Sequence, residues 1–122
     1  CCILHKNHLS KRITIRAGVR QGCVLSPLIF NMVLDTILGS ALKNHLGISW
    51  GLTNRLKDLD YADDICILSH AHHDIQNMLN NLSSEALKAG LKINIKKTKC
   101  MRLNTTCESP IRLNETIVEE VS

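Results

Sequence analysis

The sequence predicts an α+β domain with an antiparallel sheet, and three observations support this. Two long segments carry apolar residues at steps of three and four, which is typical of amphipathic helices. A segment between them is apolar on both sides of a short polar turn, as in a β-hairpin. Short alternating segments follow the second helix. This order of elements favours an antiparallel sheet packed on two helices.

The composition fits one compact domain, and we treat residues 1–122 as a single unit. The chain has 122 residues, of which 44% are hydrophobic, so it can bury one core. Only 2% are aromatic, so we expect an aliphatic core and no aromatic-rich sheet for stacking bases. These aromatic residues are Phe30, Trp50 and Tyr61.

The formal net charge is +4, and the basic residues gather in two groups. Such groups either form a solvated surface or contact the phosphates of a nucleic acid, and the sequence alone leaves both readings open. The groups are Lys11, Arg12, Arg16 and Arg20, and Lys92, Lys96, Lys97, Lys99 and Arg102.

The cysteine pattern indicates reduced thiols. The six cysteines include no CxxC pair, which suits a cytosolic or nuclear protein. The sequence shows no signal peptide and no apolar run long enough to span a bilayer. We therefore expect a nuclear or cytoplasmic protein that is not secreted and has no membrane partner.

The N-terminal segment predicts a strand followed by a helix. Ile13 and Ile15 alternate with polar residues, and we expect this strand to pair with residues 1–4 across a turn at Lys6–Asn7. A helix is then expected over residues 25–47, with Ser26 as its N-cap, Pro27 at its first position and Gly47 at its exit. Its apolar face would comprise Leu28, Ile29, Met32, Val33, Ile37, Leu38, Ala41 and Leu42.

The rest of the chain predicts a hairpin, a second helix and short strands. Residues 55–69 are expected to form strand, turn and strand, and residues 72–89 a helix that stops at Gly90. The alternation in residues 91–95 predicts a strand, and residues 100–103 and 111–121 predict shorter strands around turns. One face of the second helix would carry Ile75, Met78, Leu79, Leu82, Ala86 and Leu87.

Two adjacent carboxylates, Asp63 and Asp64, stand at the start of an apolar strand. In a regular strand their side chains would point to opposite faces, but at a hairpin turn both can reach one region. Two such carboxylates repel each other unless cations neutralise them, and hard oxygen ligands suit Mg²⁺ with substrate phosphates. The alternative is a structural Asp-rich turn, because Asp favours turns.

Three stretches, "GVRQGCVLSPLIFNMVLD", "YADD" and "GLKINIKKTK", occur in an order and spacing that resembles the reverse transcriptase domain of non-LTR (LINE-like) retrotransposons. The resemblance covers Gly18 to about Lys99 and continues more weakly beyond. It implies an RNA-directed DNA polymerase with a palm fold, here a partial palm bearing the hairpin of "YADD". The enzyme would extend a DNA primer on an RNA template with deoxynucleoside triphosphates, using Mg²⁺, or Mn²⁺ in its place.

The resemblance also implies roles for individual residues. Asp63 and Asp64 match the catalytic pair that binds two metal ions, and Tyr61 and Ala62 match residues beside the primer end. Further matches concern the loop and helix that precede this pair. Gln21 and Gly22 match the nucleotide pocket, Ser26 and Pro27 the start of the template-supporting helix, and Lys97, or alternatively Lys99, the lysine that protonates pyrophosphate.

The chain departs from the family pattern in one respect. The family uses a third aspartate on a strand upstream of the Gln-Gly loop, and residues 1–11 contain no Asp or Glu. We therefore expect a fragment of a longer polyprotein, without most of the fingers and the thumb, and inactive by itself. Two alternatives stay open: a non-catalytic nucleic-acid-binding relic of such a domain, and a group II intron type reverse transcriptase. An attached endonuclease also stays open.

Overall fold

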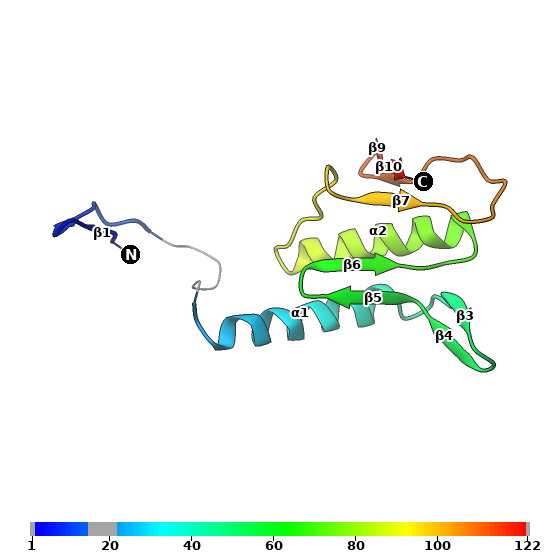
Figure 1. The fold of residues 1–122 in the computed structure, drawn as a ribbon, viewed down its shortest axis with the longest axis horizontal. Helices are drawn as coiled ribbons and strands as arrows, with labels where there is room; N and C mark the ends of the chain where they lie inside the picture. The colour runs from blue at the N-terminus through cyan, green and yellow to red at the C-terminus, as the bar shows by residue number, and fades with distance from the viewer. Residues whose placement is uncertain (1, 15–21, 122) are drawn as a thin grey trace. The chain divides into compact units, whose positions relative to one another are not determined.

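A computed structural model gives the fold of the chain and describes residues 2–14 and 22–121. These residues contain two α-helices and short strands that pair in twos, which confirms the predicted α+β class. The chain divides into two compact units, residues 1–30 and 31–122, and helix α1 (Leu25–Ala41) begins in the first and ends in the second. Figure 1 labels the elements.

The first unit contains a hairpin of β1 (Leu4–His5) and β2 (His8–Leu9). Both residues of the turn Lys6–Asn7 have positive φ, 46° and 64°, as a type I′ turn requires. The predicted turn is confirmed. The predicted strand partner is wrong, because the two-residue turn pairs Leu4–His5 with His8–Leu9 and not with the segment that contains Ile13. Ile13 lies outside any strand, and the predicted strand from Ile15 on falls outside the described residues.

Helix α1 is confirmed over most of its predicted length but is buried only toward its C-terminal end. The expectation that one apolar face is buried along the whole helix is therefore wrong for its first half. Leu28, Ile29, Met32 and Val33 stay exposed. The buried residues of the helix and the turn after it are Leu34, Ile37, Leu38, Ala41 and Leu42.

Gly47 lies six residues beyond the end of α1 and has a different role from the predicted helix exit. The chain runs from it into β3 (Ile48–Trp50), which pairs with β4 (Asn54–Leu56). Gly47 has φ +65°, and a Cβ on it would lie 2.1 Å from the backbone oxygen of Leu56. The position needs glycine because the backbone of Leu56 lies too close to leave room for a Cβ.

The predicted hairpin and second helix are both confirmed. The hairpin consists of β5 (Asp58–Tyr61) and β6 (Asp64–Ile67). Helix α2 spans His72–Lys88 and ends in a Schellman motif at Gly90, which has φ +77°. In this motif the N–H of Leu91 donates to the carbonyl of Ala86 at 2.8 Å, and that of Gly90 to Leu87 at 3.0 Å.

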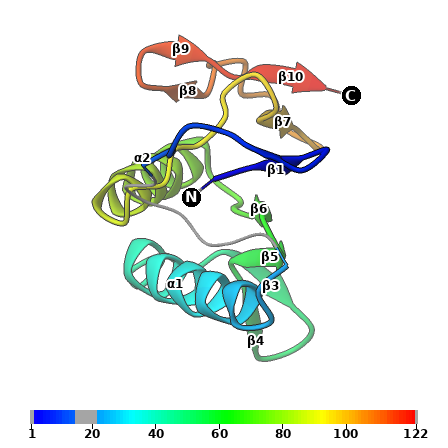
Figure 2. The ribbon, with the colours of Figure 1, turned by 90° about the vertical axis from the view of Figure 1, so that its left-hand side faces the viewer.

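The core of the second unit lies around α2, which packs against β6 and against β8 (Arg112–Leu113). Figures 1 and 2 show α2 between the β5–β6 hairpin and the strands near the C-terminus. Those strands also include β9 (Thr116–Ile117), which pairs with β8. The core cluster comprises Leu79, Ile111, Leu113 and Val118, with Ile67, Ile75, Ile93, Ile95 and Cys100 packed against it.

The remaining pair, β7 (Lys99–Met101) and β10 (Glu119–Val121), is parallel, whereas the other described strand pairs are antiparallel. These elements confirm the short strands predicted for residues 100–103 and 111–121. Among the described residues, neither helix is long and apolar enough to cross a membrane.

The strand predicted for residues 91–95 is wrong, although the alternation behind it is real. Ile93 and Ile95 pack against the core, while Lys92, Asn94 and Lys96 are exposed. No neighbouring strand pairs with this described segment, because Asn94 turns the chain instead. Its side-chain oxygen accepts the N–H of Lys96 at 3.1 Å, and its carbonyl accepts the N–H of Thr98 at 3.0 Å.

Candidate functional site

The aspartate pair lies at the tip of the β5–β6 hairpin, as predicted. Tyr61 pairs with Asp64 across the strands, so Ala62 and Asp63 form a two-residue turn. Ala62 has φ +56°, whereas Asp63 does not share a positive φ, which is the pattern of a type II′ turn. Glycine is usual at the first position of such a turn, and an alanine there costs about 1–2 kcal/mol. The turn therefore holds its carboxylates on a strained backbone.

The strand register divides the hairpin into two faces. Tyr61 and Asp64 share one face, and Tyr61 is 85% exposed. Asp60 pairs with Ile65 on the other face, which packs toward α2 through Ile67. The alternation of the strand thus points Asp60 away from the face of Asp64, and no three carboxylates gather there among the described residues. A shallow hollow of about 280 Å³ beside the tip is lined by Leu59, Asp60, Tyr61, Asp64, Ile65 and Cys66.

The two carboxylates are exposed and have no partner among the described residues. Neither the Asp63 nor the Asp64 side chain makes a hydrogen bond or an ion pair there. The situation of Asp58, on the packed face, is different. Its burial, and secondarily the charge of Asp60, raise the pKa of its carboxyl above the ordinary value. The charges at the tip are therefore available to an external cation.

The donor set at the tip fits a hard divalent cation in part. Two carboxylates from one turn supply oxygen ligands of the type that Mg²⁺ binds together with water and phosphates. In the described part of the chain, no three His, Cys, Asp or Glu side chains gather as a metal site. Asp63 and Asp64 would therefore hold a metal only together with ligands from a substrate or from other residues.

The start of α1 carries other predicted site residues, and its cap differs from the prediction. Gly22 has φ +85°, and α1 begins at Leu25, so Ser26 lies inside the helix and is not its N-cap. The thiol of Cys23 accepts hydrogen bonds from the Ser26 side chain and from the backbone of Leu25 and Ser26, which lower its pKa. Ser26 lies inside the first turn beside Pro27, because Leu25 is already helical.

Gln21, predicted to line the nucleotide pocket, lies outside the described residues. The first unit therefore retains Gly22, Ser26 and Pro27 as described candidates, all at the start of α1.

The two candidate lysines have different surroundings. Lys97 lies in the turn that Asn94 closes and donates its backbone N–H to the Asn94 carbonyl at 3.0 Å. Its exposed ammonium group has no partner among the described residues. Lys99 lies on β7 and forms an ion pair with Glu119 on β10. Of these two lysines, only Lys99 has an acidic partner among the described residues.

The second basic group likewise contains residues with an acidic partner and residues without one. Arg102 donates to the backbone carbonyls of Cys107 and Ser109, the latter at 2.6 Å, and its Nε lies 3.3 Å from Glu120. Together with Lys99, it holds the segment after β7 and the strand β10. Among the described residues Lys92, Lys96 and Lys97 have no acidic partner, and they remain available to phosphates.

Comparison with known proteins gives the family. A model described as "Reverse transcriptase (RNA-dependent DNA polymerase)" matches residues 2–115. The chain belongs to the reverse transcriptase family. This confirms the resemblance that "YADD" and its flanking motifs predicted, and polymerases of this kind use divalent metal ions.

Three relatives of this reverse transcriptase chain are named polyproteins. "Retrovirus-related Pol polyprotein from type-1 retrotransposable element R2" of Popillia japonica is 32% identical over 88 residues, 72% of this chain and 14% of the relative. The protein of that name from Nasonia vitripennis is 33% identical over 86 residues, 70% of this chain and 8% of the relative. "Retrovirus-related Pol polyprotein from type-2 retrotransposable element R2DM" of Drosophila melanogaster is 33% identical over 82 residues, 66% and 7% respectively.

These relatives support the non-LTR alternative over the group II intron alternative, because each is named for a retrotransposable element. The reverse transcriptase chain spans only a small part of their length, 14% of the first.

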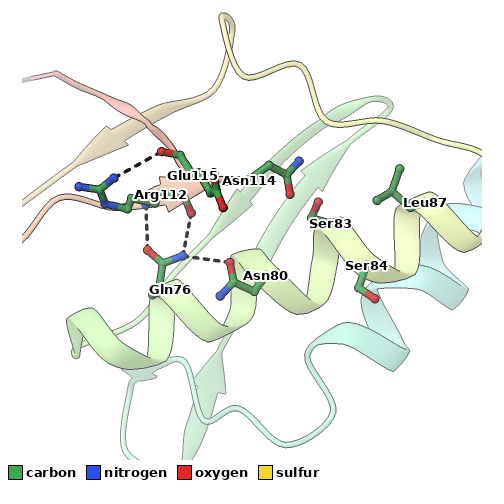
Figure 3. A pocket seen from close by; sticks show the side chains of 8 residues that line it. All are labelled: Gln76, Asn80, Ser83, Ser84, Leu87, Arg112, Asn114 and Glu115. Carbon is green, nitrogen blue, oxygen red and sulfur yellow. Dashed lines mark hydrogen bonds between the residues drawn. The ribbon is translucent and has the colours of Figure 1, made fainter.

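A pocket of about 610 Å³ between α2 and the β8–β9 hairpin contains none of the predicted site residues (Figure 3). Gln76 forms a paired contact with the backbone of Arg112: it donates to the carbonyl at 2.7 Å and accepts the N–H at 2.8 Å. Its Nε2 also donates to Asn80 at 3.0 Å. Sequence reasoning missed this link, because nothing local marks a glutamine that bonds a strand 36 residues away.

Proposed function

We propose that this chain is the palm portion of an RNA-directed DNA polymerase encoded by a mobile element. The observation that supports it most is the state of the aspartate pair. Asp63 and Asp64 stand on an exposed, strained turn with no cation among the described residues to balance them. A structural Asp turn would be expected to bond its own backbone or a neighbouring lysine.

Asp63 and Asp64 hold Mg²⁺ in this proposal, with Mn²⁺ as the alternative. The metal ions, when bound, activate the primer 3′-hydroxyl and stabilise the charge on the leaving pyrophosphate. The chain itself supplies the carboxylates and a stiff support, since β6 packs against α2 and its core. A further carboxylate comes from another part of the polyprotein.

The other predicted residues act around this pair. Tyr61 shares the exposed face of Asp64 and contacts the primer end, with Ala62 setting the turn. Lys97 protonates the pyrophosphate, and Lys99 contributes to the fold through Glu119.

The residues before and at the start of α1 would serve the nucleotide and the template. Gln21 and Gly22 contribute to the nucleotide pocket. Ser26 and Pro27 begin the helix that supports the template, and the glycine allows the backbone to approach a ligand closely.

The substrates and partners follow from this activity. They are an RNA template, a DNA primer, deoxynucleoside triphosphates and the rest of the polyprotein, including fingers and thumb. Lys92, Lys96 and Lys97 provide the phosphate contacts, because Lys99 and Arg102 are held by acidic partners. We propose that the polyprotein acts in the nucleus or the cytoplasm.

Primer extension on an RNA template tests the proposal, with a longer polyprotein that contains this chain. Asp64→Asn should lower the extension rate at least about a hundredfold, because it removes a charged ligand of the metal. The matched control is Asp60→Asn, the same chemical change on the opposite face of the same hairpin, which should stay within about twofold. Equal rates for the wild type and Asp64→Asn would refute the proposed role of the pair.

A further inference from the structure

The β3–β4 hairpin presents the only tryptophan of the chain to solvent. Trp50 ends β3 and is 63% exposed, and Leu52 at the tip of the turn is fully exposed. The hairpin points away from α2 in Figure 1. Tryptophan is enriched at interfaces, because its ring is apolar while its indole N–H can stay hydrated.

The hairpin itself carries no acidic residue, although Asp58 begins the next strand. Residues 36–57 contain no Asp or Glu but carry Lys43, Arg55 and Lys57. Lys57 donates to the carbonyl of Leu42 at 3.3 Å, which fixes it to the end of α1. Lys43 and Arg55 are exposed and have no acidic partner among the described residues. The field at the hairpin therefore attracts an anion.

The apolar area is small, and this decides between two kinds of partner. On the side of Trp50 the register places Ile48 and Leu56, and both are already half-buried. A stable protein interface buries about 800 Å² on each partner, which Trp50 and Leu52 alone do not provide. One exposed ring beside cations instead matches the requirement for stacking a single unpaired base.

We propose that the β3–β4 hairpin is a second nucleic-acid contact, at which Trp50 stacks on an unpaired base of a single strand. The strand is anionic RNA or DNA, and the inference rests on the proposed function for the presence of such a strand. Arg55 pairs with Ser49 and lies on the opposite face of the ribbon from Trp50. Its role is attraction of the backbone phosphates, not contact with the stacked base.

Intrinsic fluorescence tests this directly, because Trp50 is the sole tryptophan. Titration of the 122-residue chain with a short oligouridine or oligothymidine, without metal or triphosphate, should quench its emission. The two oligonucleotides compare RNA with DNA. An oligonucleotide of the same length with abasic sites should still bind by charge but quench little. Absence of quenching by both base-bearing strands, or equal quenching by a blunt duplex, would overturn the proposal.

Variants measured by anisotropy of a labelled oligonucleotide give a second readout. Trp50→Ala should weaken binding about tenfold, with the salt slope unchanged, because stacking carries no charge. Trp50→Phe should retain most of the affinity. Arg55→Ala should reduce the slope by about 0.7, the value for one phosphate contact on a single strand. Leu52→Ala is the matched control, since it removes exposed apolar area at the same tip without a ring, and its affinity should not change.

Unchanged affinity in Trp50→Ala, or an equal loss in Leu52→Ala, would overturn the proposal. Thermal melts of the variants show whether each one folds. The outcome is independent of polymerase activity: loss of primer extension in Asp64→Asn concerns the aspartate pair alone. Strand binding through Trp50 can therefore fail while extension succeeds, and the reverse.

Discussion

The Nδ1 atom of His45 lies 2.5 Å from Oδ1 of Asp74, and this contact joins the segment after α1 to the first turn of α2. Ser69 donates to the other carboxylate oxygen of Asp74 at 2.7 Å, and Asn81 contacts Nε2 of His45 at 3.2 Å. Asp74 is thus the centre of a polar link within the second unit.

This link predicts a pH dependence of stability. The hydrogen bond from His45 first, and then that from Ser69, lower the pKa of Asp74. A lowered carboxyl pKa contributes stability above the unfolded-state value, near pH 4, and that contribution is lost as the pH falls through the folded-state pKa. Asp74→Asn should therefore lower the free energy of unfolding by about 1–2 kcal/mol at pH 7, and by less at pH 3.

Urea unfolding of the wild type and Asp74→Asn between pH 3 and 7 measures the difference. The groups that face Asp74 are His45, Ser69 and His73, and Glu108→Gln serves as an exposed control with no such partners among the described residues. A gap between wild type and Asp74→Asn that does not shrink toward pH 3 would show that Asp74 contributes through its shape and not through its charge.

The turn of the aspartate hairpin predicts an unusual effect of glycine. Ala62 has φ +56°, so Ala62→Gly should raise stability by up to about 1 kcal/mol, after the entropy cost of glycine. Ala62→Val should lower it by more than about 1 kcal/mol, because a β-branched residue is disfavoured at positive φ. The control is Ala89→Gly at φ −84°, where glycine should destabilise. Thermal melts rank the three, and destabilisation by Ala62→Gly would contradict the strained turn.

The start of α1 predicts a selective thiol reaction. The pKa of Cys23 is lowered, with the Ser26 side chain as the largest cause, and the thiol is exposed. At neutral pH it should therefore react with iodoacetamide faster than the exposed thiol of Cys66, because the thiolate is the nucleophile. Peptide mapping by mass spectrometry measures both rates in one sample. Ser26→Ala should slow Cys23 and leave Cys66 unchanged, and equal rates at the two thiols would contradict the hydrogen bonds at Cys23.

Sequence patterns predicted the elements that depend on neighbouring residues, namely the second helix and the aspartate hairpin. The spacing of apolar residues located α2, and the tight polar turn located the β5–β6 hairpin with its aspartates. The alternation in residues 91–95 correctly predicted which side chains face the core, but a strand also needs a neighbour, and Asn94 bends the chain away from one. Contacts between distant segments, such as Gln76 with Arg112, leave no periodic signal.

The candidate site shows the same limit. The residue types at the tip predicted its chemistry, whereas the unusual φ of Ala62 could not be read from an alanine. The second basic group looked uniform along the sequence. It divides only because β10 brings Glu119 and Glu120 beside Lys99 and Arg102.

The lysines without acidic partners should therefore affect nucleic-acid binding, whereas Arg102 should affect stability. Lys96→Ala with Lys97→Ala should flatten the salt dependence of primer–template binding by about two phosphate contacts and change stability by less than about 0.5 kcal/mol. Arg102→Ala should lower stability by about 2 kcal/mol, because it frees two carbonyls and Glu120. Fluorescence anisotropy across a salt series and urea unfolding measure the two effects. An unchanged salt dependence in the double variant would show that these lysines do not contact phosphates.

The aspartate pair predicts a separation of activity from stability. Asp63→Asn keeps the size and the turn preference of the side chain but removes a charge that repels Asp64. Without metal, the variant should be as stable as the wild type or slightly more stable, with a change below about 1 kcal/mol. In the longer polyprotein it should abolish primer extension, because a ligand of the metal is lost.

Two measurements separate this from a structural pair: a thermal melt of each chain without divalent ions, and a second melt with Mg²⁺. Added Mg²⁺ should stabilise the wild type more than Asp63→Asn, since binding to the folded state raises apparent stability. Asp60→Asn carries the same change in net charge on the other face and should respond to Mg²⁺ like the wild type. If Asp63→Asn instead lowers stability and spares extension, the pair caps its own turn, and the metal must be held elsewhere.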